Sequence, residues 1–130
     1  LEVMTAPEPP ILLVEDNEVN RDMLVRRLQR AGHEVATAAD GEAALTAMRE
    51  QQPAVVLMDM NLPLKDGWTA CREAQQDASI ADIPIIALTA HAMEEDKHRA
   101  LEAGCSDYAT KPVDFPNLLT KIAAQFDARH

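Results

Sequence analysis

Residues 55–67 read VVLMDMNLPLKDG, which is four aliphatic residues, then Asp59, then a break that contains Pro and Gly. Strands that are covered on both faces carry continuous apolar runs of this kind, whereas half-exposed strands alternate apolar and polar residues. From Ile11 onward the chain repeats the same order of short aliphatic run, polar break and longer segment with helical spacing. This recurrence is typical of βα units built around a parallel sheet.

The other runs are residues 11–14, 35–38, 85–88 and a weaker 108–109. Runs 11–14 and 85–88 are apolar throughout and predict buried strands, whereas 35–38 alternates and predicts an edge strand. Five strands alternating with five helical segments predict a doubly wound, three-layer α/β domain, because crossovers between parallel strands are short and right-handed.

The helices are expected over residues 18–31, from Asp40 to just before Pro53, over 68–76, over 94–103, and from Asp114 onward with Pro116 in the first turn. Asp40 and Asp114 are expected to be N-caps, and Gly32 and Gly104 to end their helices in the left-handed conformation. In the first helix, the side expected to be buried consists of Val19, Met23, Leu24, Leu28 and Ala31.

The 130 residues carry a net charge of −10, from 12 basic and 22 acidic side chains, which argues against binding of nucleic acid by this domain. Apolar residues make up 47% of the chain, which excludes disorder, and aromatic residues only 3%, which predicts an aliphatic core. No window approaches the roughly 18 apolar residues of a membrane helix. Cys71 and Cys105 are expected to be reduced, buried thiols of a cytoplasmic protein.

Charged and polar residues stand directly after the apolar runs. Glu15 and Asp16 follow the first run, Asp59 the third, Thr89 the fourth and Lys111 the fifth. In open parallel sheets the ligand lies beyond the carboxyl ends of the strands, so these side chains should converge at one edge. Carboxylates without His or Cys favour a hard cation, and an incomplete set favours Mg²⁺.

The same group of residues suggests phosphoryl chemistry. A carboxylate beside Mg²⁺ can attack a phosphoryl group and become an acyl phosphate. Asp59 is the best-placed nucleophile because it ends the central strand. Thr89 and Lys111 would then donate to phosphoryl oxygens.

Four segments together resemble the receiver (phosphoacceptor) domain of bacterial two-component response regulators: LVEDN at 13–17, LMDMNLPLKDG at 57–67, ALTA at 87–90 and YATKP at 108–112. The similarity covers about residues 11–126. It implies a flavodoxin-like fold with strand order 2-1-3-4-5. It also implies that a sensor histidine kinase or histidine phosphotransfer protein passes a phosphoryl group to the aspartate.

The resemblance further implies a role for each matching residue. Asp59 matches the phosphorylated aspartate. Glu15 and Asp16 match the acid pair that positions Mg²⁺, and Asn61 matches the position whose backbone carbonyl completes the metal shell. Lys111 matches a catalytic lysine that precedes a proline, often with a cis peptide bond between them.

Two more residues match the switch of this family, Thr89 as its hydroxyl and Tyr108 as its aromatic ring. If Thr89 moves toward the phosphoryl group, Tyr108 can fill the vacated space. This would change the surface formed by helix 94–103, strand 108–109 and the last helix, which an unidentified downstream protein would read. Asn61 and His91 match positions that flank the hydrolytic water and are expected to tune the lifetime of the acyl phosphate.

We expect residues 1–10 to be an added remnant followed by an extended leader, with Met4 as a native start, and residues 11–130 to form the receiver domain. A single-domain regulator is favoured, with a receiver from a hybrid histidine kinase or multidomain regulator as the alternative. The domain is expected to be a phosphoacceptor that assists its own phosphorylation and dephosphorylation, and not an enzyme. An aspartyl-nucleophile phosphatase is the less favoured alternative, because such enzymes usually carry a second acid where this chain has Asn61.

Overall fold

The computed structural model describes residues 9–62, 65–90 and 94–129. Within these ranges strands and helices alternate strictly, as the sequence predicts. The elements are β1 (Ile11–Val14), α1 (Glu18–Arg30), β2 (Val35–Ala38), α2 (Gly41–Gln51), β3 (Val55–Asp59), α3 (Gly67–Gln75), β4 (Ile85–Thr89), α4 (Glu94–Glu102), β5 (Asp107–Thr110) and α5 (Phe115–Arg129). None of the helices in these ranges is both long and apolar enough to cross a bilayer.

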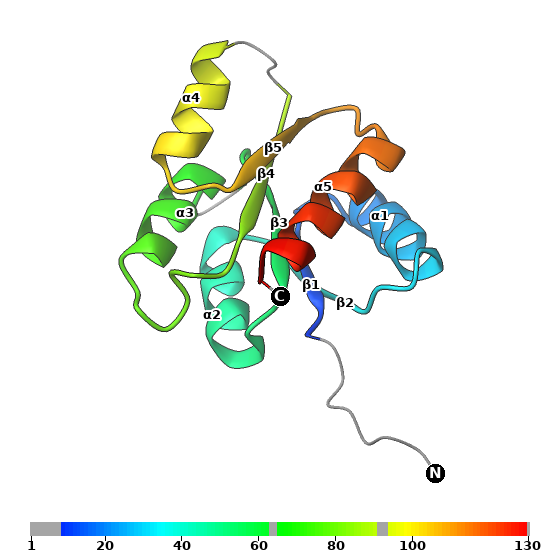
Figure 1. Ribbon diagram of the computed structural model, residues 1–130, viewed down its shortest axis with the longest axis horizontal. Helices are drawn as coiled ribbons and strands as arrows, with labels where there is room; N and C mark the ends of the chain where they lie inside the picture. Colours follow the sequence, from blue (N-terminus) through cyan, green and yellow to red (C-terminus); the bar gives the residue numbers. More distant parts are fainter. Residues whose placement is uncertain (1–8, 63–64, 91–93, 130) are drawn as a thin grey trace.

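The strands form one parallel sheet in the order β2-β1-β3-β4-β5, which confirms the predicted order. Helices α1 and α5 cover one face, while α2, α3 and α4 cover the other, so the domain has three layers (Figure 1). Every residue of β1, β3 and β4 is buried, and the edge strand β2 is partly exposed. The strands with continuous apolar runs are therefore buried on both faces, and the strand with an alternating sequence lies at the edge of the sheet.

Side-chain caps begin four of the helices. The predicted caps Asp40 and Asp114 accept hydrogen bonds from the backbone N–H groups three residues later, and Asn17 and Asp66 do the same for α1 and α3. These bonds satisfy N–H groups that have no partner inside the helix. At the other ends, Gly32 and Gly104 adopt φ angles of +97° and +98°, which confirms the two predicted left-handed positions.

The expected buried side of α1 is wrong in part. Leu24 and Leu28 are buried, but Val19 is 76% exposed and Met23 is 49% exposed, and Ala31 is also exposed beyond the end of the helix. A helix turns by about 100° per residue, so Met23 lies about 100° away from Leu24, and Val19 lies farther round. The face that packs on the sheet is thus narrower than the apolar residues suggest, which leaves two apolar side chains in solvent.

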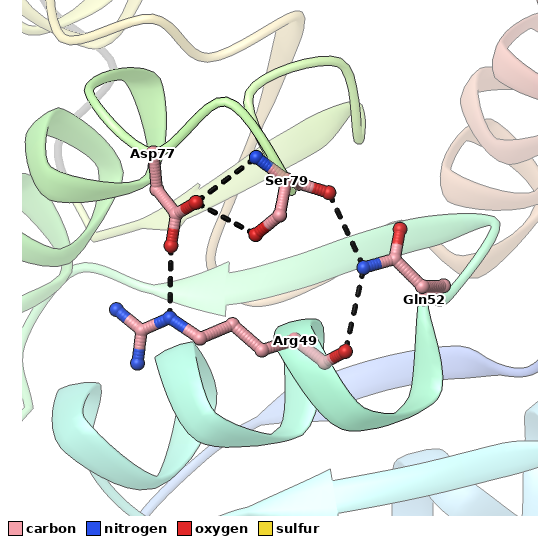
Figure 2. A network of polar contacts seen from close by, with 4 residues as sticks. All are labelled: Arg49, Gln52, Asp77 and Ser79. Atoms are coloured by element: carbon pink, nitrogen blue, oxygen red, sulfur yellow. Dashed lines mark hydrogen bonds and ion pairs between the residues drawn. The ribbon is translucent and has the colours of Figure 1, made fainter.

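A polar network ties the end of α2 to the loop that precedes β4 (Figure 2). Asp77 accepts from Arg49 Nε at 2.9 Å and from the backbone N–H and hydroxyl of Ser79 at 2.9 and 2.6 Å. Gln52 Nε2 donates to the carbonyl oxygens of Arg49 and Ser79. The Arg49 guanidinium and the Ser79 bonds lower the pKa of Asp77 to about 2. These residues lie before β3 and β4, so they hold the edge of the domain opposite the carboxyl ends of the strands.

Candidate functional site

The carboxyl ends of β1, β3, β4 and β5 bring the predicted residues to one edge of the sheet. Val14 pairs with Met58 and Thr89 with Thr110, so the residues that follow these pairs are neighbours. Glu15, Asp59 and Thr89 are only 3%, 3% and 5% exposed, and these three are the buried polar or charged residues among those described. Since buried polar groups need partners, this edge has to be organised around them.

Lys111 supplies the positive charge of this edge. Its Nζ lies 2.8 Å from Asp59 Oδ2 and 3.9 Å from Glu15 Oε1. The backbone N–H of Lys111 donates to the Thr89 carbonyl oxygen at 2.8 Å, which joins β5 to β4 at the site. The Lys111–Pro112 peptide bond is cis, as the resemblance implies. One ammonium thus faces two buried carboxylates.

Each carboxylate oxygen of Asp59 has a donor. Oδ2 accepts from Lys111, and Oδ1 accepts from the backbone N–H of Asn61 at 2.9 Å. Burial alone would raise the pKa of Asp59. The hydrogen bonds with Glu15, Lys111 and Asn61 lower it by more than burial raises it, so the pKa lies below its ordinary value of 3.8. Asp59 therefore stays ionised near neutral pH.

Glu15 has the opposite behaviour. Burial, followed by the hydrogen bond to Asp59 and the negative charge of Asp59, raises the pKa of Glu15 from 4.5 to about 7. The charge of Lys111 only partly offsets this rise. The edge therefore carries more negative charge than one ammonium neutralises.

A divalent cation fits this excess charge. Glu15, Asp16 and Asp59 each offer a carboxylate oxygen within 4.8 Å of the others, with Asp16 exposed at the rim. An all-oxygen donor set suits Mg²⁺, and three carboxylates leave positions for water or for phosphoryl oxygens. Burial is the first cause of the raised pKa of Glu15, and the neighbouring Asp59 carboxylate adds to it.

Two residues outside the predicted set support the loop after β3. A Cβ atom on Gly67 would lie 2.6 Å from the Asp59 carbonyl oxygen and 2.6 Å from Met60 Sδ, so only glycine allows α3 to begin this close to Asp59. Lys65 forms ion pairs with Glu42 of α2 and Glu73 of α3. The Asp66-Gly67 pair marks a turn in the sequence, but nothing in the sequence indicates the partners of Lys65.

The two predicted switch residues lie on neighbouring strands. Thr89 ends β4, while Tyr108 in β5 is half-buried against the core on the α3 and α4 side and pairs with Ala87. Lys121 Nζ of α5 lies 5.1 Å from the centre of the Tyr108 ring. Tyr108 thus lies on the strand next to the one that Thr89 ends, and its ring is in contact with Lys121 of α5. His91 lies outside the described residues.

A groove of about 600 Å³ opens beside the site between α1 and the segment after β5. Glu15 and Lys111 border it, together with apolar side chains that include Met23, Leu24 and Val113. The exposed Met23 therefore lines the approach to the site. The groove therefore presents both charged and apolar groups beside the site.

We expect Glu15→Gln to stabilise the metal-free protein at pH 8. The pKa of Glu15 is higher in the folded state than its ordinary 4.5, so wild-type stability falls as the pH rises from 4.5 to about 7. The amide loses no proton, so the variant gains an advantage across that window. We expect about 1–2 kcal/mol by urea unfolding, because one pKa unit corresponds to about 1.4 kcal/mol and solvent at the rim reduces the effect.

The matched control is Glu34→Gln, an exposed glutamate at the opposite edge, which should leave the unfolding midpoint unchanged. Saturating Mg²⁺ should remove the advantage of Glu15→Gln, because a ligand that binds the folded state stabilises the wild type. An equal or lower stability of Glu15→Gln at pH 8 without metal would contradict the raised pKa of Glu15.

Comparison with known proteins places the chain among signalling domains. The family model described as "Response regulator receiver domain" matches residues 11–123. The chain is 41% identical to the transcriptional regulatory protein AfsQ1 of Streptomyces coelicolor, over 89% of this chain and 50% of that protein. It is 34% identical to the polar-differentiation response regulator DivK of Brucella anthropi, over 86% of this chain and 91% of that one. The chain spans half or less of the length of several relatives.

A solved structure agrees with the sequence relatives. The receiver domain of a sensor histidine kinase from Pseudomonas aeruginosa superposes with a TM-score of 0.85 at 36% identity, covering 93% of this chain and 99% of that one. That protein was solved with a magnesium ion coordinated in its active site cleft. From its fold and from the match over residues 11–123, the chain belongs to the response regulator receiver domain family and has the flavodoxin-like architecture of that family.

Proposed function

We propose that Asp59 accepts a phosphoryl group from a sensor histidine kinase or a histidine phosphotransfer protein, in a reaction that requires Mg²⁺. The observation that carries this proposal is the environment of Asp59, an ionised carboxylate that is 3% exposed, bonded to Lys111 at 2.8 Å and flanked by two further acids. In the transfer, an Asp59 oxygen forms a bond to phosphorus, and the bond between phosphorus and the donor histidine breaks. The product is an acyl phosphate.

Glu15, Asp16, Asp59 and the backbone carbonyl of Asn61 would hold the Mg²⁺ ion. When bound, the ion neutralises charge on the phosphoryl oxygens. The Lys111 ammonium lies 2.8 Å from Asp59 and 3.9 Å from Glu15, so it is placed to stabilise the charge as it moves from the carboxylate to the phosphoryl group. Thr89 would donate its hydroxyl to another phosphoryl oxygen from the end of β4.

The phosphoryl group adds a charge of roughly −1.5 to −2 at this edge. We infer that Thr89 and Tyr108 pass this change to the surface formed by α4, β5 and α5. The support is the position of the two residues, one at the site and one on the neighbouring strand beside α5. A downstream protein would read that surface.

In this proposal the domain is a phosphoacceptor that assists its own reactions and not an enzyme acting on a separate substrate. Its partners are the phosphodonor protein and the downstream target, with no nucleic acid or membrane bound by the domain and with the cytoplasm as its compartment. The groove beside Glu15 and Lys111 supports approach of the donor from the side of α1. Residues 11–130 would act either as a single-domain regulator or as one domain of a longer protein.

The central test uses acetyl phosphate as the donor. We expect one added phosphoryl group by intact mass when Mg²⁺ is present and none when it is chelated. Asp59→Asn should abolish the modification. Lys111→Ala should slow it by roughly a hundredfold, because removal of one preorganised donor to developing charge typically costs 10²–10³ in rate.

Asp82→Asn is the matched control, since Asp82 is exposed before β4, and it should be modified like the wild type. Circular dichroism of each variant separates loss of the acceptor from loss of the fold. Labelling of Asp59→Asn to the wild-type level would refute the site assignment.

The lifetime of the acyl phosphate provides a second test. The side chain of Asn61 is exposed at the mouth of the site while its backbone N–H is bonded to Asp59, and the family resemblance places His91 at the same water. We expect Asn61→Ala and His91→Ala each to shorten the half-life several-fold after the donor is removed, because less of the acyl phosphate is screened from water. Unchanged half-lives in both variants, followed by intact mass over time, would exclude this tuning role.

A further inference from the structure

Two thiols that are far apart in the sequence meet inside the domain. Cys71 lies in the middle of α3, and Cys105 lies in the turn between α4 and β5. Their Sγ atoms are 3.4 Å apart, and the two side chains are 0% and 4% exposed. Both are free cysteines. The phosphoacceptor site uses neither of them.

The thiol pair is the middle contact of a seam between α3 and the end of α4. Residues 68, 71 and 75 lie on one side of α3, and each contacts this segment. The Arg99 guanidinium lies 4.3 Å from the centre of the Trp68 ring, and Gln75 Nε2 donates to the Gly104 carbonyl oxygen at 3.3 Å. Both flanking contacts, the one between Arg99 and Trp68 and the one between Gln75 and Gly104, are non-covalent and can break and re-form freely.

We propose that Cys71 and Cys105 form a reversible intramolecular disulfide that fastens the carboxyl end of α4 to α3. The sulfur atoms have to approach by only about 1.4 Å to reach bonding distance. Cys105 lies in the turn between α4 and β5, whereas Cys71 lies within a helix, so the movement is assigned to the side chain and turn of Cys105.

The oxidant is a low-molecular-weight disulfide such as oxidised glutathione. The Cys105 sulfur, as thiolate, attacks one glutathione sulfur, which forms a mixed disulfide and releases one glutathione thiol. The Cys71 thiolate then attacks the Cys105 sulfur, which forms the protein disulfide and releases the second glutathione. Two thiol protons leave the protein, and its two electrons reduce one glutathione disulfide to two thiols.

The two thiols have different roles in this sequence of steps. Cys105 reacts first, because opening of the last turn of α4 exposes it without unfolding the core. Cys71 lies on a helix that packs on the sheet, and the hydrogen bond to Cys105 and burial raise the pKa of its thiol well above the ordinary value. Cys71 therefore does not react first with the glutathione disulfide, and as the resolving thiol it loses its proton only as it attacks the neighbouring Cys105 sulfur.

The bridge would restrain the output surface. This step rests on the proposed function, in which phosphorylation changes the surface formed by α4, β5 and α5. A covalent bond from α3 to the turn between α4 and β5 prevents the seam from opening, since the next residue, Ser106, is already bonded to the Ile85 carbonyl oxygen at 2.7 Å. Oxidation would then leave Asp59 able to accept phosphate but hold α4 in place.

The chemical step is tested on the full chain, without metal or phosphodonor. Reduced protein is placed in buffers of increasing ratio of oxidised to reduced glutathione, trapped with iodoacetamide and analysed by mass. We expect loss of two hydrogens, no alkylated thiol, and a peptide that links Cys71 to Cys105. Return to excess reduced glutathione should restore both thiols.

The single variants test the order of attack. Cys71→Ala should accumulate a glutathione adduct on Cys105, and Cys105→Ala should remain unmodified over the same time. Circular dichroism verifies that each variant is folded. If a variant does not fold, the peptide map of the oxidised wild type still shows whether Cys71 and Cys105 are linked. Free thiols in fully oxidising buffer, adducts on both cysteines without a link, or a bridge only between two chains would overturn the proposal.

Amide hydrogen exchange tests the restraint on α4. In the oxidised protein we expect exchange of residues 99–105 to slow by about tenfold or more, because the bridge blocks local opening. With Mg²⁺ and acetyl phosphate, both forms should gain a phosphoryl group, but only the reduced form should change its exchange in α4. Unchanged protection of residues 99–105 in the bridged protein would refute the restraint. Absence of phosphorylation in the reduced protein would instead refute the proposed function and leave the bridge standing.

Discussion

The contact between Lys111 and Asp59 is the interaction on which the rest of this edge depends. Two buried carboxylates, with a third at the rim, are tolerable only because an ammonium lies 2.8 Å from one of them and 3.9 Å from another. One ammonium does not neutralise three acids, and the negative charge of Asp59 adds to the effect of burial in raising the pKa of Glu15 to about 7. In the proposed function these acids would hold a divalent cation, so the arrangement that weakens the metal-free fold would also serve the site, and stability and function would be opposed at this edge.

Much of the remaining structure serves to hold these groups at fixed positions. Parallel pairing places the ends of β1, β3, β4 and β5 side by side, and the bond from Lys111 N–H to Thr89 joins the last two strands at the site. Gly67 lets α3 begin against the backbone of Asp59, and Lys65 ties the same loop to α2 and α3. Backbone hydrogen bonds and close packing supply this rigidity, which long exposed side chains could not.

The element order and the caps Asp40 and Asp114 could be predicted because they depend on local rules, whereas the strand order came from the resemblance to receiver domains. Continuous apolar runs marked the buried strands, and Asp40 and Asp114 marked helix starts through bonds to residues only three positions away. The prediction failed where burial depends on a distant neighbour. Val19 and Met23 are as apolar as Leu24, but the sheet and α5 cover only one stripe of α1, and the sequence does not indicate how wide that stripe is. The ion pairs of Lys65 with Glu42 and Glu73 could not be predicted either, because they too join residues that only the fold brings together.

The amino-acid sequence was enough to show which chemical groups follow each strand, because this needs only the order of residues and the rule that parallel strands share a carboxyl edge. The family, and the roles expected of Asn61, Tyr108 and His91, came from the resemblance of four short segments to receiver domains. The tertiary structure alone decided how those groups differ. Burial and neighbouring charges, which depend on distances through space, keep Asp59 ionised while they raise the pKa of Glu15. The same is true of Cys71 and Cys105, which are 34 residues apart in the chain and 3.4 Å apart in the fold.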